Sequence, residues 1–573
     1  MAQGRSLASL AALFALAACG GGGGTAAPPP STAADAVLSV SLSGGASPGI
    51  DHLWVTVTGL AMHADATHVF GDGDPGWIVQ TLSTPVTVDL ADASSTNNSA
   101  VSLFKQSVST FGSFAQLRLL VAPSDPSSTL ASSASAKGLQ FNDQVQYTDA
   151  TGVHVVPLEL PDAQAGLRVL APFNLSSDTT TPLAIEWNAN SLVRRAGVGV
   201  GADNRFTLRN ELQGYNQQLL SALGNSIDGS FLDSISGQLA TINFCTGTSH
   251  VGCIHDVVAS ATSLSPDGRF HREVRSVNVS ATGAFLLYPL PSDPAYDVVI
   301  RGGNMRTMIV HNVIVDPTGV LRPFPTALGS PDTPMVPVLD TTERAVTLAS
   351  ALVPAGSRVF FGQTVAGSGG GGADTPYTIA TGATDPASGR LLQAVTLPGG
   401  PLQYASFDPA NDGNGAAPTF ATVTPTEGIG AWTVWSQGTL ATTTSAMTTL
   451  AAGASTATVA DPVPRAGLAS GKLTVTLSGT PGNGADHAEL IVSNDGGIVA
   501  VVDVSSQIAS HGGTTDISVP TGESADAPAA AVYGVALRTW AAASESTTVR
   551  WIRAGAPTNM SATTTASVSL ALP

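Results

Sequence analysis

Few groups in this 573-residue sequence have residue types and spacing that could support catalysis. The run Gly45-Ala46-Ser47-Pro48-Gly49 has the G-x-S-x-G spacing of a nucleophile elbow. That elbow requires a strand-to-helix turn in an α/β sheet, with an Asp and a His later in the chain. Here the pentapeptide joins two segments with strand periodicity, and Gly and Pro are what a hairpin turn requires. We therefore expect a turn at this position and no nucleophile.

Two glycine-rich runs have spacings loosely typical of nucleotide-binding loops, namely Gly197-Val198-Gly199 and Gly367 to Gly372. Such loops bind phosphate because a following helix gathers backbone amides at its N-terminus. Neither run leads into a segment with helical periodicity inside a βαβ unit. We expect both to be loops, and no cofactor.

Cys245 and Cys253 are eight residues apart and flank a turn that contains Gly and Ser. In an oxidising compartment, a disulfide that clamps a hairpin is the simplest interpretation. The alternative is a metal site formed by these two cysteines with His250 and His255. It lacks a second CxxC-like pair, so the spacing favours a structural disulfide.

Two loops carry oxygen ligands of the kind that calcium prefers. One is Asp72-Gly73-Asp74; the other contains Asp408, Asn411, Asp412 and Asn414. The second loop is the more suggestive, yet it has no bidentate Glu at the expected interval. Because Asn-Asp-Gly-Asn-Gly is also ordinary turn chemistry, we expect no metal and keep calcium as the less favoured hypothesis.

Aromatic and imidazole side chains are the remaining candidates. Trp432 and Trp435 are three positions apart, so they lie on opposite faces of a regular strand and cannot both form a sugar-binding platform. Core filling is the favoured use. His52, His63 and His68 could gather near one loop, but their odd separations favour scattered surface histidines.

The segment that precedes all these residues has its own pattern. A charged start is followed by an apolar run from Leu7 to Ala18 and then by Leu16-Ala17-Ala18-Cys19. The run is shorter than the roughly 20 residues that span a bilayer, and it is typical of a secretory signal. The sequence resembles a bacterial lipobox, which implies loss of residues 1–18 and lipidation of Cys19. Because Gly20 and not Asp follows, the resemblance implies an outer-membrane lipoprotein that faces the periplasm or the cell surface.

The composition indicates the elements that hold these residues. Charged residues make up 11% of the chain, while 61 glycines and 37 prolines interrupt it at short intervals. This composition suits short strands rather than long helices. The formal net charge of −18 excludes a phosphate-binding basic surface, so we expect no nucleic-acid partner. We predict an all-β chain of tandem β-sandwiches that follow a signal peptide and a flexible tether.

Changes in composition suggest the domain boundaries. After the signal peptide, we expect the following units: a Gly/Pro tether (19–35), a β-sandwich (36–217), a second β-sandwich (226–317), a Pro-rich linker (318–340), and two further β-sandwiches (341–461 and 462–573).

The first sandwich carries a Val55-x-Val57 strand that ends near a His, a Trp77 strand, Asp89-Leu90, Arg118-Leu119, and Trp187 to Val193 with Asn188 and Ser191. In this order of motifs the sequence resembles a bacterial lipoprotein family, domain of unknown function 4382. The sequence departs at Ile185-Glu186-Trp187-Asn188, where the family has an acidic strand. The resemblance implies a β-sandwich and no established activity.

The second sandwich resembles the carboxypeptidase regulatory-like, transthyretin-like module. The matching order is Ile227 to Phe231, Gly283-Ala284-Phe285, Leu290-Pro291 and Tyr296-Asp297-Val298. Such modules are accessory and carry no peptidase chemistry. In the last unit, Val535 to Trp540 and Thr548 to Trp551 predict a closing hairpin of an immunoglobulin- or fibronectin-like sandwich.

These patterns together predict a non-catalytic cell-envelope scaffold that binds a protein or polysaccharide partner and reaches the membrane through its N-terminal lipid. The alternative is an extracytoplasmic hydrolase acting on glycans or peptides, with a site between sandwiches. An enzyme would gather two carboxylates, or a Ser/His/Asp set, in a pocket, whereas a binder would present a shallow face.

Overall fold

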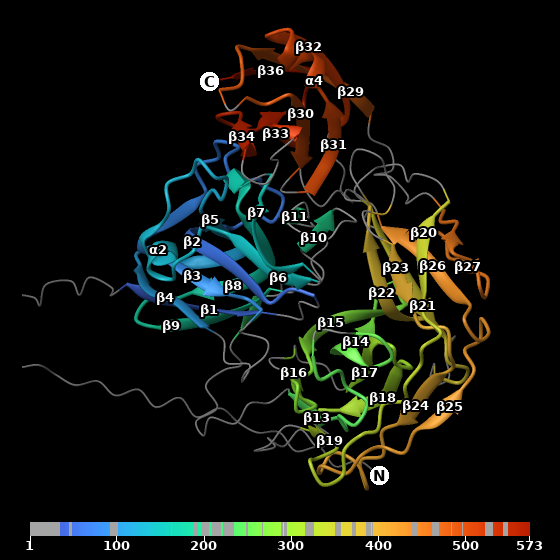
Figure 1. The fold of residues 1–573 in the computed structure, drawn as a ribbon. Coiled ribbons are helices and arrows are strands. Elements are labelled where there is room, and N and C mark those ends of the chain that lie inside the picture. Colours follow the sequence, from blue (N-terminus) through green and yellow to red (C-terminus); the bar gives the residue numbers. More distant parts are fainter. Residues whose placement is uncertain are drawn as a thin grey trace, which may run out of the picture.

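The computed structural model describes most of the chain from residue 35 onward, and its elements are almost all strands. It describes residues 35–44, 49–91, 101–149, 151–161, 163–187, 193–196, 205–208, 219–221, 234–247, 250–265, 267–287, 290, 295–315, 326–349, 357–368, 374–384, 391, 394–437, 444–460, 469–482, 484–494, 497–521, 531–542 and 548–572. Several curled sheets form tandem β-sandwich domains, as the sequence predicts (Figure 1).

The first domain packs a four-stranded sheet against an eight-stranded one. The smaller sheet has the order β12-β9-β1-β4; its strands are β1 (Ala36–Gly44), β4 (Val101–Val108), β9 (Thr180–Trp187) and β12 (Leu219–Ser221). The larger has the order β10-β11-β7-β6-β2-β5-β8, with β3 beside β2; its strands are β2 (His52–His63), β3 (Ile78–Asp89), β5 (Gly112–Val121), β6 (Gln144–Asp149), β7 (Gly152–Glu159), β8 (Leu167–Leu175), β10 (Val193–Ala196) and β11 (Arg205–Leu208). Helix α2 (Ser132–Ala136) and the turn η1 (Ala163–Ala165) lie in connections.

Strand β2 shows how the sequence pattern produces the core. Leu53, Val55 and Val57 alternate into the core, and Leu60 continues the pattern after a bulge between Val57 and Gly59 has shifted the alternation by one residue. A Cβ at Gly59 would lie 2.6 Å from the carbonyl oxygen of Gln80. Any other residue would collide with that oxygen, so this close approach of the two strands requires glycine at position 59.

The central part of the chain forms one ten-stranded sheet flanked by two three-stranded ones. The large sheet has the order β25-β24-β18-β17-β14-β15-β22-β21-β26-β27; its strands are β14 (His255–Leu264), β15 (His271–Asn278), β17 (Ala295–Gly303), β18 (Met308–Ile314), β21 (Arg358–Gln363), β22 (Tyr377–Ala383), β24 (Leu402–Ser406), β25 (Ala421–Val423), β26 (Trp432–Gln437) and β27 (Thr448–Leu450). The small sheets are β16-β13-β19, with β13 (Ile235–Gln238), β16 (Ala284–Leu287) and β19 (Thr326–Leu328), and β23-β20-β28, with β20 (Arg344–Leu348), β23 (Val395–Leu397) and β28 (Thr456–Ala457).

This sheet differs from the predicted division into separate sandwiches at 226–317 and 341–461. Strands from 341–461 flank β14, β15, β17 and β18 on both sides, through β15–β22 and β18–β24 pairs. The expected linker 318–340 contains β19, and Met335 bridges to Leu239. The physical reason for the continuous sheet is that β15 and β18 would otherwise be edge strands, whose amides and carbonyls would be left unsatisfied. Both faces of this sheet are covered: the neighbouring residues Val298 and Val299 in β17 point to opposite faces and pack in two different cores.

The last domain, from residue 469, has its own core and two sheets. Its strands are β29 (Ala469–Ser478), β30 (His487–Asn494), β31 (Gly497–Asp503), β32 (Gly512–Thr521), β33 (Val532–Trp540), β34 (Arg550–Arg553), β35 (Thr558–Asn559) and β36 (Thr565–Ala571), with the short helix α4 (Ser505–Ala509). The predicted pairing of β33 with β34 is confirmed, with Arg538 opposite Trp551. The final strand, β36, does not belong to the sheet that contains β33 and β34; it pairs with β29 in the three-stranded sheet β32-β29-β36.

Among the described residues, no helix has the length and apolar character needed to cross a membrane.

Candidate functional site

A disulfide joins Cys245 and Cys253 and closes a loop between β13 and β14. The loop is tied down on both sides. Cys245 donates its backbone N–H to Ile254, and the side-chain amide of Asn304 donates to the carbonyls of His250 and Cys253 at 2.9 and 3.0 Å. Asn304 has a positive φ of 55°, a conformation that Asn tolerates better than most residues. Two restraints therefore fix the loop: the disulfide within it and the side chain of Asn304 outside it.

Four exposed aliphatic side chains lie in this loop and in the segments next to it. Ile242 is 83% exposed and Val251 is 90% exposed, and the large apolar side chains of Val336 and Leu339 are also exposed. Backbone contacts bring these segments together: the amide of Ala240 donates to Met335, and Leu339 forms a bridge with Met305 next to Asn304. We call Ile242, Val251, Val336 and Leu339 the disulfide-loop surface.

The disulfide decides between the two hypotheses for these cysteines. A metal ligand must be a thiolate, and both sulfur atoms are bonded to each other. His250 and His255 remain close, with ring centroids 4.1 Å apart, and Asp256 lies beside them. Burial lowers the pKa of His255, and the neighbouring His250 lowers it further.

A second polar group lies where β15 meets β22 in the ten-stranded sheet. Asp297 in β17 joins the Nδ1 atoms of His271 and His311, at 3.0 and 2.9 Å, and accepts the amide of Asn312 at 2.6 Å. The ring of Tyr377 stacks on His271 at 4.1 Å. Burial would raise the pKa of Asp297, but the two neighbouring imidazoles hold it well below its usual range, while the carboxylate of Asp297 raises the pKa of His311. The group fastens the junction of the sheet.

A buried ion pair links the first and last domains. Glu159, at the end of β7, binds the guanidinium of Arg538 in β33 through contacts of 2.8 and 3.1 Å, and that of Arg205 in β11 at 3.0 and 3.3 Å. Arg553 also donates to the carbonyl of Leu160. Burial would raise the pKa of Glu159, but the charges of Arg205 and Arg538 prevail and lower it to about 2. We call these contacts the domain seam.

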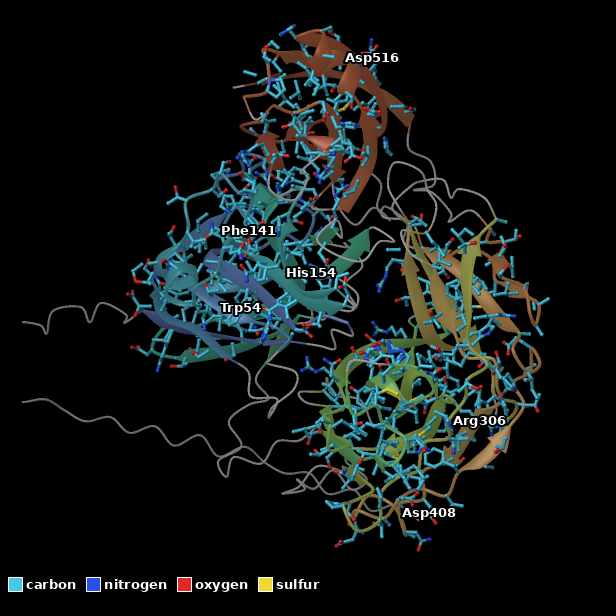
Figure 2. All side chains as sticks on the ribbon, viewed as in Figure 1. Trp54, Phe141, His154, Arg306, Asp408 and Asp516 are labelled. Carbon is cyan, nitrogen blue, oxygen red and sulfur yellow. A yellow bond between two sulfur atoms is a disulfide. The ribbon has the colours of Figure 1, made fainter. Side chains whose placement is uncertain are left out.

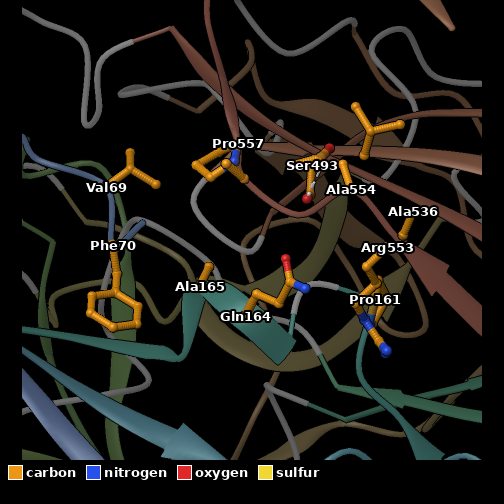
Figure 3. A pocket seen from close by; sticks show the side chains of 13 residues that line it. Val69, Phe70, Pro161, Gln164, Ala165, Ser493, Ala536, Arg553, Ala554 and Pro557 are labelled. Atoms are coloured by element: carbon orange, nitrogen blue, oxygen red, sulfur yellow. Dashed lines mark hydrogen bonds between the residues drawn. The ribbon is translucent and has the colours of Figure 1, made fainter. Parts of the chain in front are cut away.

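A small pocket lies beside the domain seam (Figure 3). Val69, Phe70, Pro161 and Gln164 line it from the first domain. Residues of three segments of the last domain line the other side, namely Ser493, Gly534 to Ala536, and Arg553 to Pro557 without Gly555. Its walls contain a single charged side chain, that of Arg553. The pocket therefore offers neither paired carboxylates nor a Ser/His/Asp set.

His63, the last residue of β2, and the loop 64–77 that follows it form a histidine group that the sequence pattern did not predict. His63 and His68 do not lie scattered, since their rings are 4.5 Å apart and Asp72 and Asp74 lie beside them. His52 lies elsewhere, with Nδ1 2.5 Å from Asp89. The signal in the sequence was the compact spacing of His63, His68, Asp72 and Asp74. Odd separations argued against a shared site only while a regular strand was assumed, and this segment is a folded loop.

In the Asp408 loop (Asp408 is labelled in Figure 2), three of the four carboxylate oxygens of Asp408 and Asp412 accept hydrogen bonds from protein donors. Asp408 accepts the amide of Ala410 and the side-chain amide of Asn411, while Asp412 accepts the amide of Asp408 at 2.7 Å. Asn414 is exposed and bridges to Ala327. This is a self-capped turn.

Trp432 and Trp435 are both fully buried, and they face different cores. Trp540 and Trp551 are half-buried, each with an arginine over its ring. Cys19, the signal peptide of residues 1–18, the tether up to residue 34, Ser47, Gly197 to Gly199 and Gly369 to Gly372 lie outside the described residues.

Comparison with known proteins supports one part of the chain. Residues 35–209 match the family described as a domain of unknown function, DUF4382. No curated protein matches the chain. Among solved structures, the chain is similar to the Bacillus anthracis TIE protein, with 9% identity, 95% of this chain and 75% of that chain covered, and a TM-score of 0.12. A score that low carries no argument about fold or function.

Proposed function

We propose that this chain is a non-catalytic cell-envelope lipoprotein that binds a protein partner through the disulfide-loop surface. The observation that carries the proposal is the exposure of Ile242, Val251, Val336 and Leu339 around a loop fixed by a disulfide. Exposed aliphatic groups on a rigid frame are typical of protein interfaces. A polysaccharide would need aromatic platforms, and Phe111 is the exposed large aromatic residue among those described. This favours a protein over a polysaccharide.

The proposed anchor is Cys19, lipidated after removal of residues 1–18, with the chain on the outer membrane and facing the periplasm or the cell surface. The disulfide suits that oxidising location. We also propose that 226–317 derives from the carboxypeptidase regulatory-like module. Its β16 and β17 follow the order expected there, and Phe285 packs over Gly237, where a Cβ would lie 2.1 Å from the ring.

The scaffold role rests on how the domains are fastened. Asp297 with its two histidines holds the central sheet together, and Glu159 with Arg538 and Arg205 holds the two end domains. The hydrolase alternative has less support, because the Asp297 group is largely enclosed and acts between strands.

Photo-crosslinking in the native bacterium tests the proposal. A photoreactive side chain at Val251 should give an adduct with one identified envelope protein, and Val251→Asp should abolish its co-purification. The same probe at Val153, which is also exposed but lies in the first domain, is the matched control. Equal adducts at both positions, or adducts with glycan alone, would contradict the proposal. Mass spectrometry of the N-terminal peptide, with Cys19→Ser as the control, tests the anchor separately.

A further inference from the structure

We propose that His63, His68 and Asp74 form a zinc-binding site in the first domain. One nitrogen from each histidine and a carboxylate oxygen of Asp74 all lie within 4.8 Å of one another. His63 Nε2 is 3.3 Å from Asp74 Oδ1, and His68 Nε2 is 3.8 Å from Asp74 Oδ2. Ligands at the Zn–N distance of about 2.0–2.1 Å are separated by about 3.3 Å at the corners of a tetrahedron. The three side chains therefore need only small movements to surround the ion.

The outer nitrogens of both rings have partners of their own, while the inner nitrogens of both rings face the carboxylate of Asp74. His68 Nδ1 lies 2.8 Å from Asp72 Oδ2, and His63 Nδ1 lies 3.0 Å from both the backbone oxygen and the backbone nitrogen of Asp65. Zinc at Nε2 of His63 requires the ring proton on Nδ1, from which it donates to the backbone oxygen of Asp65. A carboxylate and a carbonyl are the usual outer partners of zinc-bound histidines, because they fix the ring orientation and raise the basicity of the ligating nitrogen. This arrangement distinguishes the group from a pair of surface histidines.

Two side chains of β5 hold the loop that carries His68 and Asp74 in place. The side-chain amide of Gln116 donates to the carbonyls of Asp65 and His68, and Arg118 donates to the carbonyl of His68. Both side chains are fully buried. Trp77 packs against His63 at 4.8 Å and against Phe70. The ligands are therefore positioned before any ion arrives, which lowers the entropic cost of binding.

Gly76 keeps space open beside the ligands. A Cβ at this residue would lie 2.7 Å from His63 Nε2 and 2.8 Å from Asp74 Oδ1. A methyl group would thus enter the space between two of the three ligating atoms. His63 is buried and cannot move aside easily.

The ligand set selects the class of ion. Two imidazoles and one carboxylate suit a transition-metal ion such as Zn²⁺ or Fe²⁺, whereas Ca²⁺ and Mg²⁺ require oxygen ligands. We propose Zn²⁺ because the same ligand types hold zinc in four-coordinate sites with one water. Three protein ligands leave a fourth position for water. His68 is 34% exposed through its side chain, so the ion could enter from solvent.

Calorimetric titration of the metal-stripped full-length chain with zinc tests the proposal. We expect one tight equivalent, with affinity lowered at least 100-fold by His68→Gln or Asp74→Asn. Asp72→Asn should cost about 10- to 100-fold, as is usual for an outer partner. Gly76→Ala should also abolish tight binding, although it keeps every ligand. Circular dichroism and thermal melts of each variant report whether it is folded.

Two control variants assign the binding to this site. His154→Gln removes another His–Asp pair of the same domain, in which Nε2 lies 2.9 Å from Asp149, and should leave the affinity unchanged. His255→Gln tests the second candidate group, formed with His250 and Asp256. No tight equivalent in the unaltered chain would overturn the proposal. Tight binding that survives His68→Gln, or that His255→Gln alone removes, would also overturn it.

Discussion

The carboxylate of Glu159 in the first domain binds the guanidinium of Arg538 in the last, across 379 residues of sequence, and Arg538 is fully buried. Removing one member of a buried ion pair leaves the other charge without compensation, at a cost of about 3–5 kcal/mol. Glu159→Gln should therefore separate the end domains and raise hydrogen exchange in both β7 and β33. Lys472→Met is the control, because it removes the exposed ion pair of Lys472 with Asp516 in the last domain; Asp516 is labelled in Figure 2. Equal effects of the two variants would contradict the role of Glu159.

The domain seam should also be sensitive to acid. The two arginines lower the pKa of Glu159 from 4.5 to about 2 in the folded chain, so its stabilising effect is complete above pH 4.5. This effect, worth roughly 3 kcal/mol, is lost as the pH falls from 4.5 towards 2. Denaturant unfolding measured between pH 6 and pH 2 should show this loss, and Glu159→Gln should remove that part of the pH dependence. A variant with an unchanged acid profile would refute the prediction.

The group around Asp297 should weaken on the alkaline side. Its carboxylate raises the pKa of His311 above 6.5 in the folded state, so the charged imidazole stabilises the fold fully below pH 6.5. That contribution is lost as the pH rises through the higher folded pKa. His311→Gln should remove the decrease in melting temperature just above neutral pH. NMR titration of the His311 ring checks the direction, and a folded-state pKa below 6.5 would contradict it.

The disulfide should matter for order in its loop more than for the fold as a whole. Closing an eight-residue loop restricts the unfolded chain by about 2.5 kcal/mol in the entropic account, and Asn304 holds the loop from outside. Cys245→Ser with Cys253→Ser should lower the melting temperature by several degrees and increase hydrogen exchange at Val251. If Asn304→Ala also abolishes the remaining protection, the two restraints act together. Unchanged exchange in the double serine variant would show that the disulfide is dispensable.

Calcium should not stabilise the Asp408 loop. Ala410, Asn411 and the amide of Asp408 itself already supply donors to its carboxylates. Millimolar calcium should therefore leave the melting temperature unchanged, and terbium should show no sensitised emission that Asp408→Asn abolishes. A calcium-dependent rise in melting temperature that disappears in Asp408→Asn would restore the calcium hypothesis.

Much of the first domain could be predicted because local patterns decide it. Alternation in β2 placed Leu53, Val55, Val57 and Leu60 in the core, where each is fully buried. The Cys245 and Cys253 spacing indicated the pairing that the structure contains. These inferences depend on residues close together in the sequence.

What could not be predicted depends on residues far apart. Nothing near Glu159 indicates that Arg538 will reach it, and nothing near His271 indicates that its strand will meet Tyr377. The continuous central sheet follows from long-range strand pairings such as that of His271 with Tyr377. His63 and His68 were missed for another reason, since strand periodicity has no meaning inside a loop that folds back on itself.

Glu159 and Leu160 of the first domain contact Arg538 and Arg553 of the last domain, so these two domains lie side by side although the central sheet separates them in the sequence (Figure 1). A tensile load applied between the first and last domains would therefore fall on the domain seam and not on the central sheet. Rupture of the seam would let the two domains move apart while each keeps its own core. The domain seam thus sets how far these two domains can separate.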